Sequence, residues 1–291
     1  MHGFLCIDKP LGITSHDVVA IVRRLSRIKR IGHAGTLDPS ASGVLVLAVG
    51  PTTRLIEYVQ DETQKTYQAT ITLGSATDSD DADGTVIASA PVPVFTAITL
   101  SAVIATFVGD IQQVPPKVSA LHVDGQRMYD LARKGIAPEL PARPVHIYSI
   151  VLISWSPTSI TVEATCGKGT YIRSLARDIG VALGTHAHLC ALRRTAVGSF
   201  TIAESVSLEL LKSEGIEQWL KPNAVALAGW PIHHASETDR ALLVNGMPIL
   251  AHHPDRHRVA IVDASGELLA TAEQREKHLH PNKVFRWSDT P

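Results

Sequence analysis

Alternating and continuous apolar runs predict strands along much of this chain. Alternate residues from Tyr67 to Leu73 share one face, which is the pattern of a half-buried strand. The run from Val44 to Val49 is apolar throughout and rich in β-branched residues, as expected for a fully buried strand. Further strands are predicted at 4–8, 145–154 and 159–166, and a hairpin at 259–263 and 267–272.

Helical segments lie between these strands. One helix is predicted to begin at a Thr14 or Ser15 cap and to run to about Leu25, because a hydroxyl at the cap can accept a hydrogen bond from the first turn. Two more are predicted, one ending near Leu183 and one from Thr238 to Asn245.

The pattern is interrupted between Trp219 and His234, where prolines and a glycine gather. A chain of 291 residues with 45% hydrophobic content can bury a sizeable core and has room for one large and one small domain. We therefore expect a first domain at 1–230 and a second at 231–291.

Composition narrows the class of protein further. No apolar run approaches the roughly 20 residues needed to cross a bilayer, and the N-terminus lacks a basic segment followed by a long apolar one, so we expect a cytoplasmic protein. The three cysteines, Cys6, Cys166 and Cys190, show no CxxC spacing. Reduced thiols are expected, with neither a disulfide framework nor a zinc site.

The net charge of −1 argues at first against a nucleic-acid partner, because affinity for RNA depends largely on cations that neutralise phosphates. The distribution of charge changes this picture. Five basic residues and no acid stand between Val18 and Leu37: Arg23, Arg24, Arg27, Lys29 and Arg30. Such a run is often only a solvated face, so an RNA-binding surface and a plain surface both remain open.

The segment from Gly32 to Gly43 is the strongest candidate for chemistry. Three glycines and a proline in twelve residues exclude a regular helix, and the buried strand follows directly. Asp38 therefore lies on a loop anchored by rigid structure. An aspartate before proline is commonly a turn former, so composition alone does not make it catalytic.

Three other patterns suggest ligand sites and fail on spacing. The Asp-rich turn from Thr77 to Gly84 lacks the glutamate of a calcium loop, since Ala90 stands at that position. Gly-Lys-Gly-Thr at 167–170 lacks the glycine and the hydroxyl residue of a P-loop. His186, His188 and Cys190 have no fourth ligand at a telling distance, so no metal is expected.

The sequences of five segments resemble the TruB family, the bacterial tRNA pseudouridine synthases that isomerise a uridine in the T arm. GHAGTLDPSASGVL resembles the catalytic loop of that family, and DKPLGITSHDVV resembles its opening motif. Lys-Thr-Tyr at 65–67, the segment GKGTYIRSLARDIG from Gly167, and Leu-Arg-Arg-Thr at 192–195 are similar to its remaining motifs.

This resemblance implies a role for each matching residue. Asp38 takes the place of the essential carboxylate, Tyr67 that of the tyrosine against the target base, and Arg173 that of the arginine beside the carboxylate. Substrate contacts are implied for His33, Lys65, Tyr171 and Leu192. Because Tyr171 and Arg173 diverge on a helix, we expect both to lie in the loop or first turn before the helix that ends near Leu183.

The segment from about 112 to 144 is rich in proline and glycine, and from composition it reads as a long loop with one helix. The resemblance implies an RNA-gripping insertion, in which Lys117, Arg127 and Arg133 join the five basic residues above in contacting the RNA backbone. His122 departs from the family pattern, which has lysine there, so this contact is expected to be weaker or pH-dependent.

The resemblance also implies a fold and a partner. We expect an α+β pseudouridine-synthase domain with a mixed, mainly antiparallel central sheet and flanking helices, followed by a small β-rich PUA-like RNA-binding domain. The implied substrate is the T-arm stem-loop of tRNA, with the uridine at position 55 modified. The protein is expected to act as a monomer, without a cofactor, a metal or a membrane.

Two other functions compete with this one. A non-catalytic tRNA-binding or RNA-folding protein fits the insertion and the second domain, but leaves the set of Asp38, Tyr67 and Arg173 without a purpose. A carboxylate-dependent hydrolase of nucleosides or sugars would need a second catalytic acid with its own motif, which the sequence lacks. The sequence does not decide whether Asp38 attacks ribose C1′, attacks base C6 or directs proton transfer.

Overall fold

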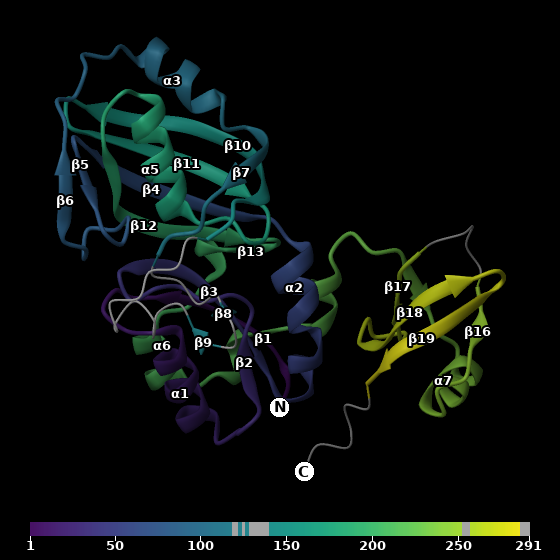
Figure 1. Cartoon of the computed structure of the whole chain (residues 1–291). Coiled ribbons are helices and arrows are strands. Elements are labelled where there is room, and N and C mark those ends of the chain that lie inside the picture. Colours follow the sequence, from purple (N-terminus) through teal and green to yellow (C-terminus); the bar gives the residue numbers. More distant parts are fainter. Residues whose placement is uncertain (118–121, 124–125, 128–139, 252–256, 286–291) are drawn as a thin grey trace.

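The computed structural model describes residues 1–117, 122–123, 126–127, 140–251 and 257–285 (Figure 1). The helices are α1 Ser15–Ser26, α2 Ile56–Glu62, α3 Ala97–Ala105, α5 Ile172–Ala182, α6 Leu208–Glu214 and α7 Glu237–Val244. Short 3-10 helices are η1 Gly50–Leu55, η2 Ile202–Glu204, η3 Glu217–Trp219 and η4 Asn223–Leu227.

The strands of the first part of the chain are β1 Gly3–Lys9, β2 Ile31–His33, β3 Ala41–Val49, β4 Lys65–Leu73, β5 Ser75–Thr77, β6 Val86–Ser89, β7 Gly109–Gln113, β8 His122–Val123, β9 Gln126–Arg127, β10 Arg143–Ser156, β11 Ser159–Cys166, β12 Ala187–Val197, β13 Phe200–Thr201 and β14 Leu220–Lys221. Those of the last part are β15 Ile232–His234, β16 Ile249–Leu250, β17 Val259–Val262, β18 Leu268–Arg275 and β19 His278–Val284.

A ten-stranded sheet forms the centre of the larger part. Its main order is β14-β1-β3-β12-β4-β11-β10-β7, with β2 also paired to β3 and β13 to β12. Neighbouring strands run antiparallel except β3 and β12, which are parallel. Figure 1 shows α1 and α6 beside one half of this sheet, and α5 and α3 beside the other half. The expected α+β class and the mixed, mainly antiparallel sheet with flanking helices are confirmed.

The periodicity of the sequence explains these elements. In β4, alternate residues from Lys65 to Leu73 are buried, and the intervening ones are half-buried or exposed. In β3, seven residues in a row from Gly43 to Val49 are buried, as the apolar run predicted. Thr14 caps α1 by accepting a hydrogen bond from the Asp17 N–H, and the Asp17 carboxylate accepts one from the Thr14 N–H.

A second, five-stranded sheet follows in the order β15-β17-β18-β19-β16. The predicted hairpin is confirmed in β17 and β18, which are antiparallel neighbours. The small β-rich C-terminal unit is therefore present. A single hydrophobic cluster nevertheless crosses the expected boundary, since Leu55, Tyr58 and Val59 share it with Val262 and Leu268. The division at 230/231 stays a prediction.

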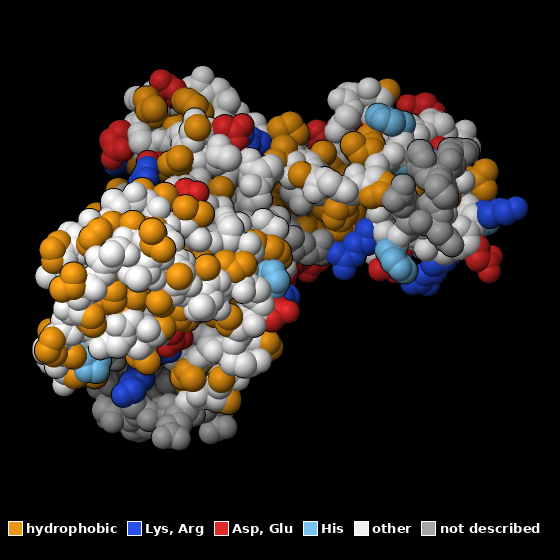
Figure 2. Space-filling view, turned by 90° about the horizontal axis from the view of Figure 1, so that it is seen from above, with side chains coloured by type: hydrophobic (Ala, Val, Ile, Leu, Met, Phe, Trp, Pro, Cys, Tyr) orange, Lys and Arg blue, Asp and Glu red, His pale blue; other side chains and the backbone are white. Residues whose placement is uncertain are grey.

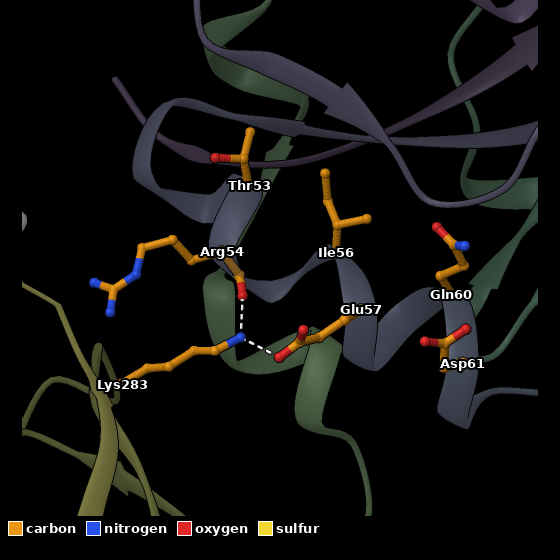
Figure 3. A pocket seen from close by; sticks show the side chains of 7 residues that line it. All are labelled: Thr53, Arg54, Ile56, Glu57, Gln60, Asp61 and Lys283. Carbon is orange, nitrogen blue, oxygen red and sulfur yellow. Dashed lines mark hydrogen bonds and ion pairs between the residues drawn. The ribbon is translucent and has the colours of Figure 1, made fainter. Parts of the chain in front are cut away.

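Cations hold the junction between the two sheets. Lys283 on β19 donates to the Arg54 carbonyl oxygen at 2.6 Å and pairs with the Glu57 carboxylate (Figure 3). In return, Arg54 donates to the Val284 carbonyl at 2.6 Å and stacks over the Phe285 ring at 4.8 Å. The C-terminal unit is thus fixed to α2 by charge-assisted hydrogen bonds as well as by apolar burial.

The face of the larger part around α3 carries no charge over a long stretch of chain. No charged residue occurs between Asp83 and Asp110, and Ile87, Val94 and Ile98 are exposed there. Figure 2 looks onto the molecule from the side of α3 and shows many hydrophobic side chains and few lysines or arginines on this part. Among the described residues, no helix is both long and apolar enough to span a bilayer.

Candidate active site

The loop that carries Asp38 enters the sheet at its one parallel seam. β3 begins at Ala41 immediately after the loop, and Ala41 lies opposite Leu192 of β12. Ser15 at the start of α1 is 1% exposed, and its hydroxyl both accepts from the Leu37 N–H at 2.8 Å and donates to the Leu37 carbonyl at 3.0 Å. The Gly12 N–H binds the Pro39 carbonyl at 2.8 Å. Both flanks of Asp38 are therefore anchored.

Asp38 and Arg173 are brought together across the sheet. Arg173 Nη2 lies 3.0 Å from Asp38 Oδ2, and the arginine side chain is 11% exposed against 47% for the carboxylate. Arg173 is the second residue of α5, and Tyr171 is its N-cap, in the positions that the sequence predicted. A half-exposed carboxylate held in direction by a nearly buried guanidinium is open to a ligand on its other side.

The Asp-rich turn at 77–84 also contacts Arg173, on a different guanidinium nitrogen from Asp38. The sequence pattern did not indicate this contact. Arg173 Nη1 donates to the Ser79 carbonyl at 3.4 Å, and Ser40 of the catalytic loop donates to Asp81 Oδ2 at 3.5 Å. Burial raises the pKa of Asp81, and the positive charge of Arg173 opposes that rise. Asp81 is therefore a second carboxylate that acts on the same arginine as Asp38.

Arg177 connects this turn to the base of the insertion. It donates to Asp80 Oδ2 at 2.7 Å and to the Val114 carbonyl at 3.0 Å. Burial raises the pKa of Asp80, and the charge of Arg177 opposes it. The Tyr171 N–H also binds the Gln113 side chain, at 2.8 Å. The insertion thus leaves the sheet beside the first turn of α5, next to Asp38 and Arg173.

Tyr67 lies on β4 with its side chain on the core side of the sheet, 9% exposed. It is opposite Arg194 of β12 in the strand pairing. Burial raises the pKa of the Tyr67 hydroxyl, and the charge of Arg194 opposes this rise, while that of Asp38 adds to it. Tyr67 therefore borders both the core and the carboxylate, which fits a position beneath a bound base.

His33, on β2, faces His16 of α1 in an edge-to-face contact with ring centroids 5.4 Å apart. Its Nδ1 is buried and has no hydrogen-bond partner among the described residues. Burial lowers the His33 pKa from 6.5, and the charges of His16 and Arg194 lower it further. A neutral imidazole with a spare nitrogen is therefore expected at pH 7.

Lys65 and Leu192 occupy different surroundings. The Lys65 amine binds the end of α2, where it donates to the Gln60 carbonyl at 2.5 Å and the Thr63 carbonyl at 3.2 Å. Burial lowers the pKa of Lys65, with the charge of Arg194 as a further cause. This geometry makes Lys65 a support of β4. Leu192 is half-buried at the seam, next to the end of the catalytic loop.

All five basic residues between Val18 and Leu37 are exposed. Arg23 donates to the Ile31 carbonyl at 2.9 Å, and Arg30 to the Thr53 hydroxyl at 2.6 Å, so these two also have structural contacts. Lys117 is exposed at the start of the insertion, and Arg127 lies on β9. Arg133 lies outside the described residues. Their contacts with RNA stay predictions.

Comparison with known proteins defines the class. A sequence model of the N-terminal domain of TruB family pseudouridylate synthases matches residues 23–172, and one of the tRNA pseudouridylate synthase B C-terminal domain matches residues 173–223. The sequence and the fold are thus those of a pseudouridylate synthase, an isomerase. The chain is 41% identical to tRNA pseudouridine synthase B of Rhodopseudomonas palustris over 98% of its length and 81% of the relative's. The tRNA pseudouridine synthase B of Thermobifida fusca is 42% identical to it over 98% of this chain and 99% of the relative's length. The chain belongs to the TruB family.

Solved structures agree with this assignment. A Cbf5-Nop10-Gar1 complex superposes with a TM-score of 0.74 at 26% identity, covering 98% of this chain and 85% of that one. An H/ACA RNP bound to a substrate RNA containing 2'-deoxyuridine gives a TM-score of 0.74 at 25% identity, covering 99% of this chain and 86% of that one.

Among the described residues, no group of three histidine, cysteine or acidic side chains is placed to hold a metal ion.

Proposed function

We propose that this protein converts the uridine at position 55, in the T-arm loop of tRNA, to pseudouridine. The observation that carries the proposal is the half-exposed Asp38 carboxylate held by Arg173 at the parallel seam of the sheet. The relatives named tRNA pseudouridine synthase B support tRNA as the substrate. The T-arm target rests on the resemblance of the catalytic loop to the family motif.

The reaction is a rearrangement without a net change of atoms. The bond from ribose C1′ to base N1 breaks, the base turns, and C1′ bonds to C5. The proton leaves C5 and N1 gains one. Asp38 supplies the carboxylate, Arg173 fixes its direction, and Tyr67 offers a ring face to the flipped uracil. His33, whose Nδ1 has no hydrogen-bond partner in the part of the chain that the structure describes, would contact the RNA loop from which the base was withdrawn.

The distribution of charge supports one direction of approach for the RNA. Residues 84–109, which include α3, contain no cation that could bind a phosphate. α1 lies at the opposite end of the sheet from α3 in Figure 1, and the exposed arginines follow from its last turns. The insertion leaves the sheet between these regions, beside α5. RNA that approaches from the side of α1 would meet the loop of Asp38 there, because Ser15 of α1 binds Leu37.

The test is to incubate the purified protein with unmodified tRNA and with the isolated T stem-loop, and to map pseudouridine at single-nucleotide resolution. Modification at position 55 in both substrates is expected. A matched tRNA with cytidine at that position should stay unmodified. An inert stem-loop, or modification of another uridine, would contradict the T-arm target. Binding of tRNA without any pseudouridine would favour the non-catalytic RNA-binding protein instead.

Variants of Tyr67 separate stacking from the hydroxyl. Tyr67→Phe keeps the ring face, whereas Tyr67→Leu loses it and should weaken stem-loop binding by about tenfold, the order of one base-aromatic contact. If the hydroxyl takes part in proton transfer, Phe will bind but turn over slowly. Filter binding and single-turnover rates measure both effects. Identical behaviour of both variants and the wild type would place Tyr67 in the core alone.

The C-terminal β unit is expected to add affinity for full-length tRNA without taking part in chemistry. Deleting it would expose the shared cluster at Leu55 and Tyr58, so point variants at the junction are the better test. Arg54→Ala combined with Lys283→Ala should weaken binding of full tRNA several-fold and leave stem-loop turnover unchanged. Equal loss for both substrates would show instead that the junction supports the catalytic domain.

A further inference from the structure

Arg194 is a buried cation beside the catalytic loop to which neither the motif analysis nor the proposed mechanism gives a role. The side chain is 1% exposed and is among the largest fully buried side chains of the described residues. Its Nε donates to the Val44 carbonyl at 2.7 Å, its Nη2 to the Gly35 carbonyl at 3.0 Å, and its Nη1 lies 3.5 Å from the Thr36 carbonyl. One guanidinium therefore binds three backbone acceptors.

These acceptors lie on both sides of Asp38 in the sequence. Gly35 and Thr36 precede it, and Val44 follows it at the start of the buried strand. Because the donors of a guanidinium are fixed in one plane, the three bonds set the distance between the two ends of the loop. Charge-assisted bonds to carbonyls are about twice as strong as neutral ones. The shape of the loop that presents Asp38 depends on this side chain.

The backbone of Arg194 is pressed against the same loop. Arg194 lies opposite Gly43 in the parallel pairing, and a Cβ built at Gly43 would be 2.2 Å from the Arg194 carbonyl oxygen. Gly43 also has φ +102°, where side chains are strained. β12 also pairs with β4, and there Arg194 lies opposite Tyr67. A single residue thus borders the carboxylate loop and the ring on which the base is proposed to lie.

We propose that Arg194 is a positioning residue for the reaction, which holds the loop so that Asp38 meets the uridine placed on Tyr67. The inference rests on the proposed function. Burying a guanidinium costs several kcal/mol of desolvation, and an apolar residue of similar size usually fills a core at lower cost. The three bonds join backbone on both sides of Asp38, which accounts for a charge at this position.

Arg194→Lys is the decisive variant, because it keeps the charge and loses the planar fork. Single-turnover rates on tRNA saturated with enzyme separate chemistry from binding. A rate about 10²-fold below wild type is expected, the order of effect of misplacing a reacting group by 1 Å. The Kd for tRNA should stay within about threefold, since no phosphate contact is removed. Arg194→Met, which removes all donors, should be slower still.

Two controls separate positioning from general stability. Ile71→Ala empties a fully buried site in β4 and lowers the melting temperature, yet should keep the rate within about threefold while folded. Arg275→Lys makes the same chemical change on β18 of the C-terminal sheet, where Arg275 lies 3.5 Å from Glu273, and should leave the rate unchanged. A merely structural role predicts instead that Arg194→Lys behaves like Ile71→Ala.

An Arg194→Lys rate within about threefold of wild type would overturn the inference. So would an equal rate loss in Ile71→Ala, or failure of both Arg194 variants to fold, which would make Arg194 a requirement of the whole fold. An active wild type with an unaffected Arg194→Lys overturns this inference alone. An inactive wild type overturns the proposed function and this inference with it.

Discussion

The Asp38→Asn variant is expected to form no measurable pseudouridine, with a rate lower by at least about 10³-fold, because the amide keeps the size of the side chain and loses its charge and nucleophilicity. The loop should stay in place, since its anchors at Ser15, Gly12 and Arg194 involve backbone atoms and not the carboxylate. Affinity for tRNA should therefore remain within a few-fold.

A matched control is Asp61→Asn, which makes the same chemical change at an exposed position at the end of α2. Its rate should equal that of the wild type. Single-turnover assays measure the two rates, and filter binding measures the affinities. Appreciable turnover by Asp38→Asn would remove the carboxylate from the mechanism, whichever atom of the uridine it is thought to attack.

Arg173→Lys is also expected to have a large effect, a fall in rate of about 10²-fold with little change in melting temperature. Lysine retains the positive charge, but its single ammonium cannot bind the Asp38 carboxylate and the Ser79 carbonyl in the same fixed geometry. The carboxylate would lose its direction while the local charge stayed the same.

Arg240→Lys on α7 is the control for this change, because Arg240 is distant from the seam and lies 4.0 Å from Asp263. It should leave the rate unaffected. A near-wild-type rate for Arg173→Lys would show that charge alone is sufficient, and that the pairing geometry with Asp38 does not limit the reaction.

Much of the fold follows from local pattern. The alternation from Tyr67 to Leu73 and the apolar run after Gly43 placed the two strands that border the site, and the hydroxyl at Thr14 placed the start of α1. These features depend on neighbouring residues and on burial of one face or two, so periodicity is enough to find them. The loop of Asp38 could be recognised because its glycines and its motif residues are contiguous in the sequence.

The roles of Asp81 and Arg194 could not be found in this way, because they arise from the order of strands in the sheet. Asp81 belongs to a turn that resembles a poor calcium loop, and pairing of this turn with Leu189 of β12 brings it near Arg173. Arg194 stands in a recognised motif, but alternation along β12 turns it inward while Arg193 points outward. Lys65 shows the opposite case, since its motif implied a substrate contact and its amine is bound to α2.

Asp38 is proposed to drive the transfer of C1′ from N1 to C5 of uridine in tRNA. Forming the new bond expels the hydrogen at C5, so tRNA labelled with tritium at C5 of its uridines reports the reaction directly. The wild-type protein should release tritium to water up to the content of a single uridine per tRNA, and Asp38→Asn should release none above background. Absence of release by the wild type would show that the protein does not isomerise uridine, and equal release by both proteins would show that Asp38 is not required.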